Sequence, residues 1–137
     1  MIKESAAILL YNKNKEILMM QRTLDAKHNP GCWSFFGGGF KKGETPLQAV
    51  KREAKEELGI KLSKPRLLLT TEYDNPAFTD KMHIFVQEFP KDMNEAKLDQ
   101  KEGCARVWCS ISDALKLNLS PNVRSAFEEI AKHWPYS

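Results

Sequence analysis

Cysteine is scarce in this sequence, and its few thiols do not form a framework. Among 137 residues there are three cysteines, Cys32, Cys104 and Cys109, an odd number without C-x-x-C spacing. A disulfide scaffold needs paired cysteines, and a structural zinc site needs closely spaced ligands. The sequence therefore predicts free thiols and a reducing compartment, the cytoplasm.

Long apolar runs, internal repeats and low-complexity tracts are also missing. The apolar run near the N-terminus, Ala6 to Leu10, is too short for a signal peptide or a membrane span. We therefore expect no membrane partner. A chain of 137 residues suits one domain with its own core, so we expect a single domain over residues 1–137.

A strong excess of charge of one sign is absent as well. The formal net charge is +3, with 28% charged and 42% hydrophobic residues, which is typical of a soluble globular protein. This weak basicity does not indicate a nucleic-acid binder, and we expect no nucleic-acid partner. It is compatible with a small anionic ligand.

The stretch from Gly38 to Ile60 has the start and stop signals of a helix. Thr45 is a good N-cap, Pro46 suits the first helical position, and Gln48 completes a capping box. Gly59 is a suitable C-cap, so we expect a helix from about 45 to 58.

The apolar residues of this helix recur at helical spacing and predict a face that packs on a core. That stripe consists of Leu47, Val50, Ala54 and Leu58.

Three carboxylates, Glu53, Glu56 and Glu57, lie beside the apolar stripe on the helical wheel. Like charges at this spacing repel one another. A positive group must offset that repulsion, either Arg52 and neighbouring lysines on a solvated face, or one or more divalent cations.

The residues before the helix favour the second alternative. Gly37, Gly38 and Gly39, followed by Lys41 and Lys42, form a glycine-rich, basic approach to the helix N-terminus. Free backbone N–H groups and positive charge there suit phosphate. Carboxylate oxygens suit Mg²⁺, or Mn²⁺ in its place, rather than zinc.

The spacing of these residues resembles the Nudix box, G-x5-E-x7-R-E-U-x-E-E-x-G-U with U apolar. Every fixed position of that box is matched between Gly38 and Ile60, including Glu44 and Arg52. The resemblance implies an α/β/α sandwich with a mixed β-sheet. It also implies metal-dependent hydrolysis of a nucleoside diphosphate linked to another moiety, a small-molecule substrate.

The resemblance also implies metal ligands, namely Glu56 and Glu57, with the carbonyl of Gly37 as a third candidate. Glu53 is implied to be a ligand, to orient water, or to act as the general base. Arg52 would orient the helix carboxylates, and Glu44 would hold the preceding loop.

A second candidate for the base is Glu102, which precedes Trp108 as a glutamate precedes a strand tryptophan in the family. Glu95 and Asp99 are alternative candidates in the same loop. The remaining alternative is that Glu102 is a solvated loop residue without a catalytic role.

The resemblance also implies candidate substrate-binding residues, and each of them has an alternative structural role. Arg22 reaches a phosphate or lies exposed, Phe35 stacks on a base or packs in the core, and Asn122 reads a purine or only begins a helix. Together the candidates for substrate binding are Arg22, Phe35, Gly38, Tyr73 and Asn122.

The sequence departs from the family in two places. Phe36 stands where many members have proline, and Lys41 stands where many have an acidic residue. The electrostatics next to the box are therefore expected to differ from those of relatives.

The rest of the chain supplies the sheet and the second helical layer. We expect a hairpin of 5–11 and 16–22, paired strands at 66–73 and 81–89, a loop at 90–103, a strand at 105–110, a short helix capped by Ser112 through about Leu117, and a final helix from Ser120 to about His133.

Several substrates fit this site. A nucleoside triphosphate is favoured, including an oxidised one such as 8-oxo-dGTP, with nucleotide sugars and dinucleoside polyphosphates as alternatives. An isomerase on the same scaffold is disfavoured by the short chain, and a non-catalytic nucleotide sensor is disfavoured by the intact box. Both a monomer and a homodimer remain open.

Overall fold

The computed structural model describes residues 1–94, 98–101 and 103–135. Its elements are β1 Ile2–Tyr11, β2 Ile17–Gln21, β3 Trp33–Ser34, β4 Phe36–Gly39, α1 Pro46–Leu58, β5 Arg66–Asp74, β6 Thr79–Glu88, β7 Ala105–Cys109, α2 Ile111–Ala114 and α3 Pro121–His133.

Strand β1 is the axis of a mixed, seven-stranded sheet. Along one edge it pairs in parallel with β6 over its whole length. It also pairs in antiparallel fashion with β4 over Ser5–Ile8 and with β2 at Tyr11. Strands β7 and β3 both pair with β2, and β5 pairs with β6. The predicted hairpin and the predicted pairing of β5 with β6 are therefore confirmed.

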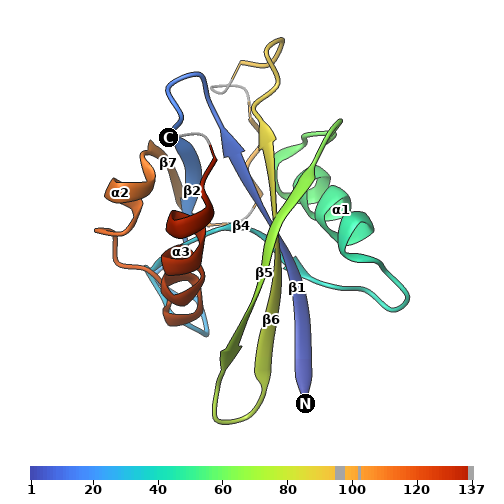
Figure 1. The fold of residues 1–137 in the computed structure, drawn as a ribbon, viewed down its shortest axis with the longest axis vertical. Coiled ribbons are helices and arrows are strands. Elements are labelled where there is room, and N and C mark those ends of the chain that lie inside the picture. The colour runs from blue at the N-terminus through green and yellow to red at the C-terminus, as the bar shows by residue number, and fades with distance from the viewer. Residues whose placement is uncertain (95–97, 102, 136–137) are drawn as a thin grey trace.

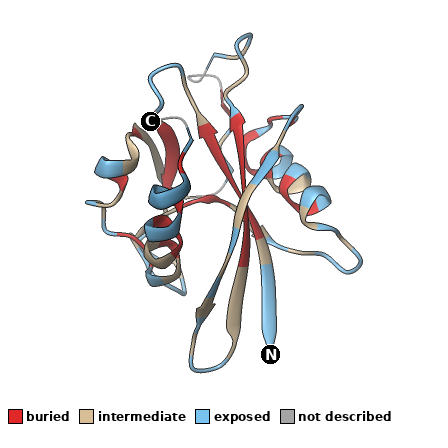
Figure 2. Cartoon of the chain, in the orientation of Figure 1, coloured by how far each residue is buried: buried red, intermediate tan, exposed pale blue. Residues whose placement is uncertain are grey.

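Helices cover both faces of this sheet, with α1 on one side and α2 and α3 on the other (Figure 1). Successive side chains of a strand point to opposite faces of the sheet, so each strand contributes to two separate cores. In β1, Ala7 and Leu9 pack in the core under α3, while Ala6, Ile8 and Leu10 pack in the core under α1. Figure 2 shows the central strands buried and the N-terminal end of β1 exposed. The predicted α/β/α sandwich is confirmed.

Helix α1 begins and ends as its sequence predicts. The Gln48 N–H donates to Thr45 Oγ1 at 3.2 Å, and the Thr45 N–H donates to Gln48 Oε1 at 3.0 Å. Gly59 closes the helix in the left-handed conformation, with φ of 69°.

The predicted apolar stripe is wrong at one position. Val50, Ala54 and Leu58 are buried, but Leu47 is 42% exposed, and Ala49 is buried instead. Leu47 points in the direction of the stripe but belongs to the first turn. Helical periodicity gives the direction of a side chain and not how far the opposing sheet extends along the axis.

Two other predictions about local structure are corrected. The glycines at 37–39 are not a loop before the helix but part of β4, paired with β1. The short helix is capped by Ser110 rather than Ser112, because the Asp113 N–H donates to Ser110 Oγ. None of the helices in the described ranges is both long and apolar enough to cross a membrane. The single-domain organisation stays a prediction.

Close packing of β4 on β1 generates a test of the fold. Gly37 has φ of 147°, and a Cβ there would lie 2.1 Å from the Ala6 carbonyl oxygen. Gly37→Ala is therefore expected to lower the free energy of unfolding by about 3 kcal/mol or more. Gly59→Ala is the control, since it is left-handed but has open space around it. It is expected to cost about 1 kcal/mol. Urea unfolding measures both, and equal losses would contradict the close approach.

Candidate active site

The side chain of Arg52 is the centre of a hydrogen-bonded network between α1 and β4. Its Nε and Nη2 donate to the two carboxylate oxygens of Glu44 at 2.7 and 2.8 Å. Its Nη1 donates to Glu53 at 2.7 Å and to Glu56 at 3.1 Å. Nη2 also donates to the carbonyl oxygen of Gly39 at 3.0 Å. One guanidinium thus ties three glutamates to the glycine strand.

Exposure increases outward across this network. The side chains of Arg52, Glu44 and Glu53 are 18%, 15% and 13% exposed, whereas that of Glu56 is 52% exposed. Ion pairs at low exposure are screened less by solvent than surface pairs. Arg52 therefore holds Glu44 and Glu53 firmly and Glu56 more loosely.

The charge state of Glu44 follows from this contact. Hydrogen bonds from the Arg52 side chain, and then from the Lys41 N–H, lower the pKa of Glu44 from 4.5 to about 2. The same pair, led by the hydrogen bond to Glu44, raises the pKa of Arg52. Both groups stay charged at neutral pH. Arg52 is thus a permanent counter-charge within the acidic group.

The carboxylates of Glu57 and Glu53 lie directly against two glycines of β4. Glu57 is 4% exposed, and its Oε1 accepts a hydrogen bond from the Gly37 N–H at 2.9 Å. A Cβ on Gly38 would lie 2.8 Å from the carboxyl carbon of Glu53. The glycines are therefore required where α1 packs its acidic edge on the strand. We call Glu44, Glu53, Glu56 and Glu57, with Arg52 among them, the carboxylate cluster.

The carboxylate cluster has the donor chemistry of a site for a hard divalent cation. Carboxylate oxygens, with backbone carbonyls nearby, are the ligands that Mg²⁺ and Mn²⁺ prefer. Within the described ranges, no group of three or more His, Cys, Asp and Glu side chains is arranged closely enough to hold a metal ion. In the structure, Arg52 supplies the positive charge for Glu53 and Glu56. A bound cation would share or exchange those oxygens.

The candidates for substrate binding fall into different places. Gly38 lies against Glu53, whereas Arg22 follows the end of β2, where its Nε donates to the His28 carbonyl oxygen at 2.9 Å. Phe35 is 4% exposed and packs on Phe127, with ring centroids 5.1 Å apart. Its burial favours the core-packing alternative over stacking on a base, because a stacked base needs an accessible ring face.

Tyr73 and Asn122 are brought together through Asp80. Tyr73 is the cross-strand partner of Asp80, and the Asn122 side chain donates to Asp80 Oδ2 at 2.7 Å. Asp80 shares its sheet face with Met82, two residues along β6, and Met82 packs in the core under α3. Tyr73 and Asn122 therefore lie on the α3 side of the sheet, opposite α1. Asp80 was not found from the sequence, because 42 residues separate it from Asn122.

A cavity of about 110 Å³ lies against the same glycines of β4 that contact the carboxylates. Its lining includes Ser5, Phe35, Gly37, Gly38 and Met82. Gly37 and Gly38 thus line this cavity and also contact two members of the carboxylate cluster, Glu57 and Glu53.

Of the three candidate acids in the loop after β6, Asp99 lies within the described residues. Glu102 and Glu95 lie outside the described residues. Asp99 forms an ion pair with Lys101 at 3.0 Å, and both side chains are well exposed. The Lys101 N–H donates to the carbonyl oxygen of Glu57 at 2.7 Å, which ties this loop to the end of α1.

His83 forms a second polar group, next to the residue that follows β4. The two ring nitrogens of His83 contact Thr70 Oγ1 at 3.2 Å and Glu4 Oε1 at 3.0 Å. Its ring stacks on Phe40, the residue after β4, at 5.5 Å between centroids. Separations of 13 and 79 residues left no local signal for these contacts.

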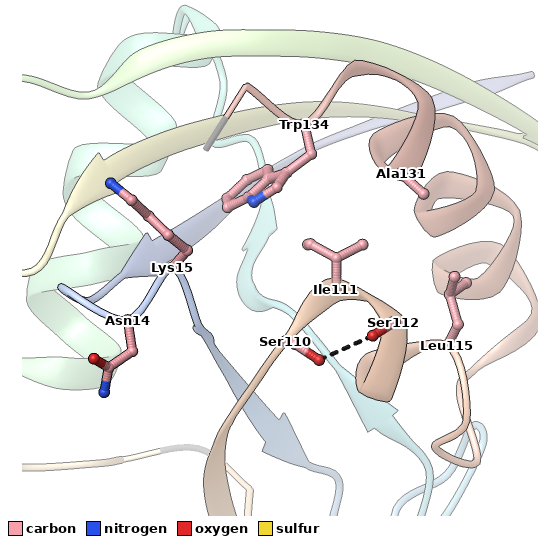
Figure 3. Close-up of a pocket in the computed structure, with 8 residues that line it drawn as sticks. All are labelled: Asn14, Lys15, Ser110, Ile111, Ser112, Leu115, Ala131 and Trp134. Carbon is pink, nitrogen blue, oxygen red and sulfur yellow. Dashed lines mark hydrogen bonds between the residues drawn. The ribbon is translucent and has the colours of Figure 1, made fainter. Parts of the chain in front are cut away.

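Another cavity, of about 380 Å³, lies between the turn after β1, helix α2 and the end of α3 (Figure 3). Its lining is mainly apolar and includes Ile111, Leu115 and Trp134. It contains none of the predicted site residues.

Comparisons with known proteins agree with this geometry. The model of the NUDIX domain family matches residues 1–130. The chain is 36% identical over 102 residues to an 8-oxo-dGTP diphosphatase of Proteus vulgaris, covering 74% of this chain and 87% of that protein. It is 31% identical over 122 residues to a CTP pyrophosphohydrolase of Escherichia coli strain K12, covering 88% and 84%.

The fold has a close counterpart among solved structures. The MutT protein from Methanosarcina mazei Go1 matches with a TM-score of 0.81 at 22% identity, over 98% of this chain and 96% of that one. With the family model over residues 1–130, a complete acidic motif and these relatives, the chain belongs to the Nudix hydrolase family and is a diphosphatase by class.

The Glu44 contacts predict a specific dependence of stability on pH. The folded pKa of about 2 lies below the ordinary value of 4.5, so the unfolded chain binds more protons between those values. The Glu44 contribution is present above pH 4.5 and is lost as pH falls toward about 2. Glu44→Gln is expected to flatten the decline of unfolding free energy in that window, measured by urea unfolding at several pH values. Parallel pH profiles for the two proteins would refute the contact.

Proposed function

We propose that the chain hydrolyses a nucleoside triphosphate to a nucleoside monophosphate and pyrophosphate, with Mg²⁺ as the divalent cation. The names of the relatives support a triphosphate, since one is an 8-oxo-dGTP diphosphatase and another a CTP pyrophosphohydrolase. An oxidised purine nucleotide is our first candidate.

One observation carries this proposal: Gly37 and Gly38 line the 110 Å³ cavity and also contact Glu57 and Glu53 of the carboxylate cluster. A nucleotide has an aromatic base at one end and charged phosphates at the other. The cavity suits the base, and Tyr73 and Asn122 lie on the same side of the sheet as Met82 of its lining. The carboxylate cluster suits the phosphates and the cation that accompanies them.

The residues of the cluster have distinct roles in this proposal. Glu53, Glu56 and Glu57 would hold Mg²⁺, with Mn²⁺ able to substitute. When bound, the cation neutralises phosphate oxygens and polarises water. Glu44 fixes Arg52, and Arg52 holds Glu53 against Gly38 so that its carboxylate is positioned before substrate binds. Preorganised groups of this kind reduce the reorganisation needed in the transition state.

The general base is either Glu53 or Glu102. Loss of a general base lowers kcat by about 10²–10⁴-fold. We expect Glu53→Gln to show that loss, with the fold intact by circular dichroism. Glu102→Gln is measured in parallel, and Glu128→Gln, on an exposed part of α3, is the control. A full loss in Glu102→Gln with an active Glu53→Gln would transfer the role to Glu102.

Ligation by Glu57 predicts a change in metal dependence. Glu57→Gln keeps the shape of the side chain but removes the charge that attracts a cation. We expect the Mg²⁺ concentration for half-maximal activity to rise by about 10-fold or more. An unchanged Mg²⁺ titration, with the Gly37 contact and the fold preserved, would argue against ligation by this residue.

A hydrolysis screen tests the function itself. Nucleoside triphosphates, 8-oxo-dGTP, nucleotide sugars and dinucleoside polyphosphates are incubated with Mg²⁺, and products are separated by chromatography. A reaction without Mg²⁺ serves as the blank. Release of pyrophosphate from a triphosphate supports the proposal. Selective cleavage of a nucleotide sugar or a dinucleoside polyphosphate would assign that compound as the substrate instead. Binding without any cleavage would indicate a sensor.

A further inference from the structure

Lys41 lies at the open edge of the carboxylate cluster, with its main chain fixed by that cluster. The Lys41 N–H donates to Glu44 Oε1 at 2.6 Å, and the same carboxylate receives two hydrogen bonds from Arg52. The backbone of Lys41 is therefore part of the Arg52 network. Its position relative to Glu56 is set by α1 and β4 rather than by a free loop.

The side chain of Lys41 adds a second cation on Glu56. Its Nζ lies 3.8 Å from Glu56 Oε1, while Arg52 Nη1 donates to Glu56 Oε2 at 3.1 Å. Arg52 is 18% exposed and Lys41 is 67% exposed, so Arg52 approaches from the interior and Lys41 from the solvent side.

The contact between Lys41 and Glu56 is weak and easily exchanged. Exposed ion pairs of this kind contribute about 0–1 kcal/mol. An ammonium on a flexible stem is a strongly hydrated point charge, which suits a mobile anion such as a phosphate oxygen. Lys41 can therefore leave Glu56 at low cost when a better anion arrives.

We propose that Lys41 is a phosphate-binding residue of this active site, resting on Glu56 until substrate arrives and then pairing with its terminal phosphates. This inference rests on the proposed function, because it requires the phosphates to lie at the carboxylate cluster.

The charge of Lys41 has opposite effects on the two ligands of the site. Beside Glu56 it repels a divalent cation that enters alone, and it attracts the phosphates that enter with the cation. If Lys41 had a merely structural role, its replacement would lower the affinity for both ligands or for neither. Opposite changes in affinity are therefore the signature of this role.

The test replaces the charge while keeping the length of the side chain. Lys41→Met is compared with Lys51→Met, which removes the same charge from an exposed position on α1, and with Lys41→Arg, which keeps the charge. Calorimetry measures Mn²⁺ binding without nucleotide, and then binding of inorganic pyrophosphate in the presence of Mg²⁺.

We expect Lys41→Met to bind Mn²⁺ about 3-fold more tightly and pyrophosphate about 10-fold more weakly than the unmodified protein. Lys41→Arg should restore pyrophosphate binding, and Lys51→Met should change neither affinity by more than about 2-fold. The difference in pyrophosphate affinity between Lys41→Met and the unmodified protein should become smaller in high salt.

Two failures can be told apart. If the unmodified protein binds pyrophosphate and cleaves a triphosphate, but Lys41→Met behaves as Lys51→Met does, the role of Lys41 is overturned and the proposed function stands. If the unmodified protein neither binds pyrophosphate nor cleaves any triphosphate, both proposals are overturned.

Discussion

The bidentate pairing of Arg52 with Glu44 is the interaction on which the rest of the site depends. It joins the loop before α1 to the helix itself, and the same guanidinium reaches Glu53, Glu56 and the Gly39 carbonyl oxygen. Without Arg52, several negatively charged carboxylates would face each other on a partly buried surface, where their repulsion is stronger than in water. Arg52 therefore makes an acidic helix edge compatible with a folded domain.

The second constraint is the absence of side chains in β4. Gly37 accommodates the main chain of β1, and Gly38 accommodates the carboxylate of Glu53. The same two glycines line the 110 Å³ cavity. One elongated ligand that lies along them can therefore reach both the cavity and the carboxylate cluster. In the proposed function, the base and the phosphates of a nucleotide occupy them.

Part of this organisation was predictable from local sequence, and part was not. The capping box, the left-handed Gly59 and the strand pairs follow from turn and cap chemistry that acts over a few residues. The exposure of Leu47 and the pairing of Asn122 with Asp80 were missed. Each depends on where another layer of the fold begins or ends, for which a linear pattern has no signal.

The sequence by itself determined the Nudix motif, the α/β/α architecture and the acidic edge of α1, because spacing along a helix fixes which side chains share a face. Only the tertiary structure decided how that edge is used. It placed Arg52 among the glutamates, turned the glycines into a strand, and set Lys41 against Glu56. These contacts join elements that a one-dimensional pattern cannot bring together, since their distances arise from packing on the shared sheet.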